Sequence, residues 1–281
     1  MKKELENEIR RITEIQQLDF EHDNLLFIDP YRINEQDGEL AKKAKIKIIK
    51  FFNLFFKCIE KSDRSKVQYI GEHLHEINST KLGYTRIDTL PNGKGFSKKN
   101  LLQIYDAAKE VEDYIEDMPD VFVLADNVGP DKISDITTNI IYEELLQFTL
   151  NIIKRHNLNM EFRKKYKYIF DVFEEKWIRK EFNVPMIDNE EILFLPKKIV
   201  ESYEIFSYET FYRKLVYPFY KTNTAIHHLI RFLKNNEERP DCKRIKEKYP
   251  LKRETVRRFK KEFPNDYNRY KDEMQKYYWM Q

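Results

Sequence analysis

The sequence predicts a mixed α+β fold that is mainly helical. Long segments repeat apolar residues at intervals of three to five, which is the spacing of one helix face, most clearly at residues 39–59 and 136–152. Short apolar runs bounded by turn-forming residues predict strands, and they occur at residues 25–28, 121–124, 184–187 and 192–195. We therefore expect a small sheet with a hairpin, packed by long helices, and a helical module at the C-terminus.

The first third of the chain is expected to be mostly helical. Residues 1–17 predict a polar helix, and residues 39–59 a strong amphipathic helix with Ala44, Ile48 and Phe55 on one side. The strand at 25–28 should end at Asp29-Pro30, because the residue before a proline is driven to extended geometry. Further segments are predicted as a helix or helix–strand junction (67–77), an extended loop or loose hairpin (78–100) and a helix (101–118).

The middle of the chain is organised around residues 120–141. The apolar run 121–124 predicts a buried strand, which breaks at Asp126-Asn127 and Gly129-Pro130. Ser134 is the expected N-cap of one long helix that runs to about residue 156, with Asp135 in its first turn. A buried strand that leads through a polar turn into a helix is a common place for chemistry and also a common piece of ordinary core.

The remaining segments predict helices and one hairpin. The strands at 184–187 and 192–195 flank a turn at Asp188-Asn189, which predicts a hairpin. Helices are expected at residues 162–181, 225–233, 242–248 and 252–263.

Charge divides the chain into two predicted domains. The whole chain has a net charge of +3, but residues 222–281 contain 16 Lys+Arg and 9 Asp+Glu, a net of +7, which leaves −4 for the rest. This asymmetry indicates a basic module, and we expect a core domain at 1–205 and a basic helical module at 206–281. The charged N-terminus, the lack of a long apolar run and two widely separated cysteines predict a cytoplasmic protein without a membrane segment.

The basic module resembles a helix-turn-helix. Residues 243–261 carry ten Lys+Arg and two Glu, Leu251 fits the turn hydrophobe, and Thr255-Val256 fits the third helix; Pro250 and Lys246 depart from the pattern. The resemblance implies that helix 252–263 lies in a DNA groove. The cations expected to contact phosphates are Arg253, Arg257, Arg258, Lys260 and Lys261. The alternative is a terminal helical bundle with a solvated basic face.

Acidic residues in the larger domain suggest a nuclease. Phosphate-binding loops, dinucleotide-binding glycine patterns and paired Cys-x-x-Cys are absent from the sequence. A nuclease of the restriction-endonuclease type needs carboxylates for Mg²⁺ and a lysine near the scissile phosphate. We expect Glu72, Asp131 and Asp135 to hold Mg²⁺, with Asp131 and Lys197 as catalytic residues. Pro130-Asp131 matches the first half of that motif, whereas Lys197 lacks the carboxylate two residues before it; helix capping is the alternative role for Asp131 and Asp135.

Two smaller motifs remain. His73 and His75 would share one face of a strand and could bind a metal with Glu72 or Glu76, but on a helix they would diverge. Gly93-Lys94-Gly95 could meet a phosphate, although a surface loop is the simpler interpretation.

Three stretches together resemble uncharacterised bacterial proteins associated with phage-defence or restriction loci: Leu82-Gly83-Tyr84, Gly93-Lys94-Gly95-Phe96 and residues 129–135. The resemblance favours a nucleic-acid-binding bacterial protein, and a Mg²⁺-dependent nuclease in phage defence. The alternative is a non-enzymatic DNA-binding regulator, or an effector or scaffold subunit that acts through a partner protein or as a homo-oligomer.

Overall fold

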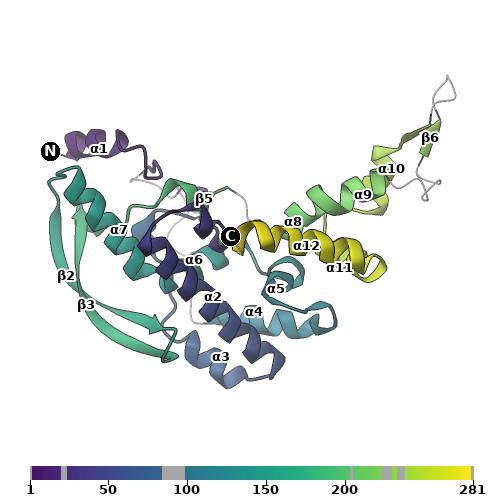
Figure 1. Cartoon of the computed structure of the whole chain (residues 1–281), viewed down its shortest axis with the longest axis horizontal. Coiled ribbons are helices and arrows are strands. Elements are labelled where there is room, and N and C mark those ends of the chain that lie inside the picture. The colour runs from purple at the N-terminus through teal and green to yellow at the C-terminus, as the bar shows by residue number, and fades with distance from the viewer. Residues whose placement is uncertain are drawn as a thin grey trace, which may run out of the picture.

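The computed structural model describes residues 2–19, 24–83, 99–202, 205–222, 230–232 and 238–279. It confirms the predicted mainly helical α+β fold (Figure 1). The helices are α1 (Lys2–Arg10), α2 (Glu39–Glu60), α3 (Arg64–Ile70), α4 (Lys99–Glu110), α5 (Met118–Leu124), α6 (Pro130–Ile140), α7 (Tyr142–Arg155), α8 (Tyr208–Phe211), α9 (Tyr217–Thr222), α10 (Cys242–Lys248), α11 (Arg253–Glu262) and α12 (Pro264–Trp279).

The strands form small antiparallel sheets. They are β1 (Phe27–Ile28), β2 (Glu161–Asp171), β3 (Lys176–Ile187), β4 (Glu190–Glu191), β5 (Val200–Glu201), β6 (Ile230–Phe232) and β7 (Glu238–Pro240). The largest sheet has the order β2-β3-β4, while β1 pairs with β5 and β6 with β7. The β2–β3 hairpin is a long curved ribbon along the left of Figure 1, and the predicted turn at Asp188-Asn189 joins β3 to β4.

Helix α2 lies at the centre of the core, as its apolar periodicity predicts. Its buried Phe51 meets Phe170 of β2 edge-to-face at 5.5 Å between ring centroids, and Phe52 meets Phe122 of α5 at 5.2 Å. Burying each such ring contributes about 1.5–3 kcal/mol of transfer free energy. One helix thus joins the hairpin on one side to α5 on the other.

The predicted strand at 121–124 is wrong, because these residues belong to helix α5. Asp117 caps this helix by accepting a hydrogen bond from the Asp120 backbone N–H at 3.0 Å, and Pro119 occupies the first turn. Every residue of α5 is buried, against α2, α4, α8 and α11. A four-residue apolar run fits a buried helix as well as a buried strand. In the sequence, Asp117 as a cap and Pro119 in the first turn were the features that indicated a helix.

The expected single helix from Ser134 to residue 156 is also wrong. Gly129 caps α6 with Pro130 at its first position, and the chain breaks at Ile141 before α7 begins. Ser134 lies inside α6, where its Oγ accepts a hydrogen bond from the Ile28 backbone N–H at 3.0 Å. The serine therefore ties α6 to strand β1 instead of starting the helix.

The predicted helix at 162–181 is wrong as well, since this segment forms the β2–β3 hairpin. The register pairs Tyr166 with Glu181 and Phe170 with Trp177. The Asp171 carboxylate accepts hydrogen bonds from the backbone N–H groups of Phe173 and Glu174 at the turn. The dense Lys, Tyr and Phe content hid an alternation of period two along β2.

Several boundaries also differ from prediction. The helix expected over 101–118 ends with α4, and that expected over 67–77 is reduced to α3. Only Glu190–Glu191 pair with β3, so residues 192–195 are not a strand. Residues 230–232 are a strand and not part of the helix expected over 225–233. Residues 223–229 lie outside the described residues, as do residues 84–98, which include the Gly93-Lys94-Gly95 motif.

The C-terminal helices share the core of the rest of the chain. Phe259 and Tyr267 belong to the same cluster of buried apolar residues as Phe51 and Phe122. Figure 1 shows α11 and α12 beside α5, while α9, α10 and the β6–β7 hairpin extend away from the body. Within the described residues, no helix has both the length and the apolar character that a membrane span requires.

Candidate functional site

Two of the cations expected to contact phosphates cap helix α5 instead. Arg253 Nη1 donates hydrogen bonds to the carbonyls of Phe122 and Val123, each at 3.0 Å. Arg257 donates from Nε and Nη2 to the Leu124 carbonyl at 2.8 and 2.6 Å. The last carbonyls of a helix lack partners within it and favour a cation. The structure therefore engages both guanidinium groups inside the protein.

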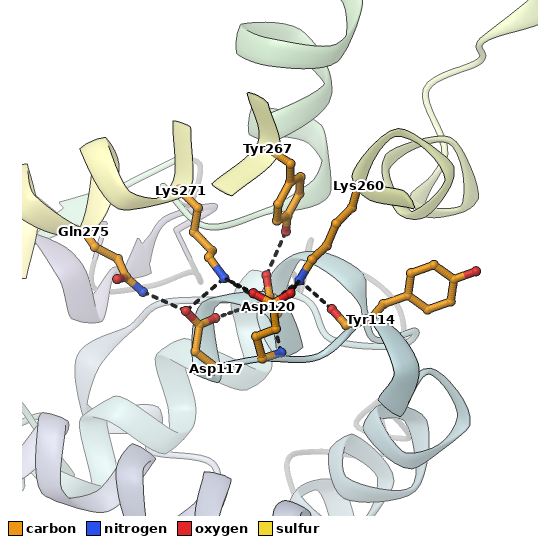
Figure 2. A network of polar contacts seen from close by, with 8 residues as sticks. Tyr114, Asp117, Asp120, Lys260, Tyr267, Lys271 and Gln275 are labelled. Carbon is orange, nitrogen blue, oxygen red and sulfur yellow. Dashed lines mark hydrogen bonds and ion pairs between the residues drawn. The ribbon is translucent and has the colours of Figure 1, made fainter. Parts of the chain in front are cut away.

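A third predicted cation, Lys260, belongs to a buried ionic network (Figure 2). Asp120 is 0% exposed, and its Oδ2 accepts hydrogen bonds from Lys260 Nζ at 2.7 Å and Lys271 Nζ at 3.1 Å. Its Oδ1 accepts one from the Tyr267 hydroxyl at 3.0 Å, while Lys271 also pairs with Asp117 at 3.0 Å. Because Asp120, Lys260 and Lys271 are buried and occupied with one another, they fasten α11 and α12 to α5.

The electrostatics of this network favour the charged form of Lys271, whereas burial and the neighbouring Asp120 carboxylate raise the pKa of Asp117. Burial alone would lower the pKa of Lys271, but attraction to Asp120 and Asp117 outweighs it and raises that pKa. Burial, together with the neighbouring Asp120 carboxylate, raises the pKa of Tyr267 well above its usual value. Tyr267 is therefore a neutral hydrogen-bond donor at physiological pH.

The exposed side of α11 has no excess positive charge. It presents Arg258 and Lys261, the other two predicted phosphate contacts, together with Glu254 and Glu262. Arg258 pairs with Glu262 at 2.8 Å. Helix α11, which the resemblance places in a DNA groove, thus directs its other cations into the body. Positive and negative charges balance on its exposed side.

Helix α10 carries the cationic surface that α11 lacks. Ile245 is its buried residue, and Glu247 is its acidic residue. Its exposed cations, which we call the α10 cationic surface, are Lys243, Arg244, Lys246 and Lys248. Two acidic side chains lie beside these cations: Lys243 is 4.0 Å from Glu247, at the limit of an ion pair, and Arg244 Nε is 3.6 Å from the Asp241 carboxylate that caps the helix. Figure 1 shows α10 on the part of the chain that projects from the body.

The two residues predicted to be catalytic, Asp131 and Lys197, lie on different elements. Asp131 lies in the first turn of α6, where a hydrogen of Gly129 leaves room for its Oδ1. Lys197 is exposed, and its backbone N–H donates to the Glu14 carbonyl at 3.2 Å. In the described part of the chain no ion pair joins Lys197 to Asp131. Gly129 is the N-cap of α6 and no side-chain hydrogen bond caps this helix, so Asp131 acts there as a negative charge that the helix dipole favours.

Asp135 is the one predicted metal ligand in an unusual environment. It is half-buried, and its pKa is raised to about 8 by burial, by Glu76 and by Asp131. Glu76, and not the predicted Glu72, is the neighbouring carboxylate from the 72–76 segment. Across the described ranges there is no group of three or more His, Cys, Asp or Glu side chains that could hold a metal ion. The predicted Mg²⁺ site therefore has no support from the geometry.

The histidine pair lies in an irregular segment, neither strand nor helix. The His73 ring stacks on Tyr168 of β2 at 3.8 Å between centroids and 2° between planes. The His75 backbone carbonyl accepts a hydrogen bond from Asn139 Nδ2 at 2.6 Å. The His75 ring Nδ1 lies 3.0 Å from the His73 backbone carbonyl, so one imidazole contacts Tyr168 and the other contacts the local backbone. The role of Tyr168 could not be seen while its segment was expected to be helical.

Fold and surface together define an α+β body with a projecting basic helix. Residues 5–207 match a protein family described as a domain of unknown function (DUF8370), and the chain belongs to that family. None of the curated proteins and none of the solved structures matches the chain. The matched region ends close to the boundary expected at residue 205, so Asp120 lies inside it and its partners on α11 and α12 lie outside.

Proposed function

We propose that the protein binds nucleic acid through the α10 cationic surface. The observation that carries the proposal is four exposed cations on a seven-residue helix with a single acidic residue. Lys and Arg that neutralise phosphates release condensed counterions, and this supplies most of the non-specific affinity for nucleic acid. The β6–β7 hairpin lies next to α10 on the same projecting segment, which gives a long polyanion room to approach (Figure 1).

The helix-turn-helix resemblance assigns nucleic-acid contact to its third helix, which is α11 here. The proposal assigns that contact to the second helix, α10. In a helix-turn-helix the second helix crosses the phosphate backbone while the third reads bases. Here α10 is exposed and α11 is engaged by α5, so the surface suits backbone contact and not base readout. Backbone contacts position a protein without reading sequence. We therefore expect weak dependence on nucleotide sequence.

A charge-reversal pair tests the proposal. Arg244 and Lys248 are one helical turn apart and both exposed, so Arg244→Glu with Lys248→Glu inverts half of the surface. Binding is measured by fluorescence anisotropy with labelled duplex and single-stranded DNA at low salt. We expect wild-type binding and at least a tenfold loss in the double variant.

The matched control makes the same charge change elsewhere. Lys57 and Lys61 are exposed, are also four residues apart, and lie at the C-terminal end of α2. Lys57→Glu with Lys61→Glu should leave affinity within about twofold. Equal losses in both double variants would show only a net-charge effect and would refute the α10 assignment.

A second candidate is a Mg²⁺-dependent nuclease acting in phage defence. It would use Asp135 with the neighbouring Glu76 and Asp131 carboxylates to hold Mg²⁺, although the described residues contain no group of three such side chains placed to hold a metal ion. Plasmid DNA and RNA are incubated with Mg²⁺ or Mn²⁺ and with chelator. Metal-dependent cleavage that Asp131→Ala removes would support the nuclease; intact binding without cleavage would leave a regulator, or a scaffold that acts through a partner protein.

A further inference from the structure

An open pocket of about 330 Å³ lies between the irregular segment 72–75 and strand β2. Strand β2 and helix α10 lie at opposite ends of the molecule (Figure 1). Ligand pockets start at about 300 Å³, so the volume suits one planar ring system. The lining residues are Glu72, His73, Leu74, His75, Tyr166, Lys167 and Tyr168.

Exposed aromatic rings form one wall of the pocket. Tyr166 is 59% exposed and Tyr168 is 44% exposed. They are two residues apart on one strand and therefore face the same side of the sheet. His73 covers one face of Tyr168, and the Arg179 guanidinium lies over Tyr166 at 4.3 Å from the ring centroid. Each ring is thus held from one side while much of its surface faces solvent.

Hydrogen bonds and ion pairs fix the other wall. Asn139 of α6 holds the His75 backbone, donating to its carbonyl at 2.6 Å. Lys167 projects from the opposite face of β2 to the two tyrosines and pairs there with the buried Glu191 at 2.9 Å, which anchors the strand behind the pocket. A rigid wall lowers the entropic cost of ordering side chains when a ligand binds.

The chemistry of the pocket matches an unpaired base and its phosphate. Aromatic faces stack on any base, and Arg adds a cation–π contribution. Glu72 supplies acceptors, and His75 a donor or acceptor, for the edge of a base. Lys164 lies on the same face of β2 as Tyr166, and its side chain is 75% exposed. Its ammonium pairs with Glu181 at 2.9 Å, so a phosphate would compete with that carboxylate.

We propose that this pocket binds one unstacked base of a single-stranded nucleic acid. The inference rests on the proposed nucleic-acid binding and adds a preference for single strands. A duplex cannot use the pocket, because its bases are stacked and paired. The α10 cationic surface would hold either form, so the two surfaces make separable contributions.

The test compares single-stranded RNA and DNA oligonucleotides with a duplex of equal length, in anisotropy titrations of Tyr166→Ala. Loss of one base–aromatic stack is worth about 1–3 kcal/mol, or roughly 5- to 150-fold in affinity. We expect a loss in that range for single strands and no change for the duplex. Tyr166→Phe, which keeps the ring, should bind single strands like the wild type.

The matched control is Phe173→Ala. Phe173 is 65% exposed in the turn of the same hairpin but does not line the pocket, so its removal should change nothing. If Tyr166→Ala and Phe173→Ala bind single strands equally well, the pocket inference is overturned while nucleic-acid binding stands. If the wild type binds no nucleic acid at all, the proposed function fails and the inference fails with it.

Discussion

Substitution of Asp120 by asparagine should detach the C-terminal helices from the body. Asp120→Asn preserves the shape of the side chain and removes the charge that Lys260 and Lys271 share. Both lysines remain buried, at 5% and 3% exposed. The asparagine amide also places N–H donors where either the two lysine ammonium groups or the Tyr267 hydroxyl now donate, so the loss is not limited to charge.

The cost follows from the burial of the two ammonium groups. Removing one partner of a buried ion pair costs about 3–5 kcal/mol, because an uncompensated charge is left behind. Here Asp117 still contacts Lys271 at 3.0 Å and Glu116 contacts Lys260 at 3.3 Å. We therefore expect a loss of about 2–4 kcal/mol in the free energy of unfolding.

Urea denaturation monitored by circular dichroism measures the loss, with Glu116→Gln as the control. Glu116 contacts the same two lysines but is 59% exposed, so its removal should cost less than about 1 kcal/mol. Hydrogen exchange should show α12 losing protection before α2 does. If Asp120→Asn lowers the free energy of unfolding no more than Glu116→Gln does, the buried network does not hold α11 and α12 against α5.

Two further substitutions test the site description. Asp135→Asn should stabilise the protein by on the order of 1–3 kcal/mol at neutral pH, after discounting for partial exposure, since the pKa of about 8 shows that the fold disfavours the carboxylate. In the wild type, Asp135 contributes stability that is fully present below the unfolded pKa of 3.8 and is lost as pH rises towards 8. The asparagine variant should lack that part of the dependence of melting temperature on pH. An unchanged pH dependence would contradict the assignment. Arg257→Met leaves the Leu124 carbonyl without its donor and should cost about 1–3 kcal/mol in urea denaturation; a neutral result would mean that α5 needs no cap from α11.

The fold class was predictable because long helices such as α2 carry a strong periodic signal. Its predicted range, 39–59, differs from Glu39–Glu60 by one residue. The failures came from short or mixed segments. Met118–Leu124 is buried on all sides, so periodicity could not separate helix from strand, and only Asp117 and Pro119 marked a helix start.

The site was less predictable, since the partner of a cation depends on tertiary packing. Arg253, Arg257 and Lys260 recur at intervals of four and three, which places them on one face of α11. That spacing indicates burial and leaves Arg258 and Lys261 outside. The pocket residues Tyr166 and Tyr168 were missed because their segment was expected to be helical; their alternation with lysines on β2 was the available signal.

The salt dependence of binding tests the central claim most directly. Each phosphate contact to duplex DNA contributes about 0.9 to the slope of log affinity against log salt. We predict that the wild type binds with a clear negative slope and that Arg244→Glu with Lys248→Glu makes that slope shallower by about 1.8. A wild-type protein that does not bind, or a double variant with the wild-type slope, would contradict that claim.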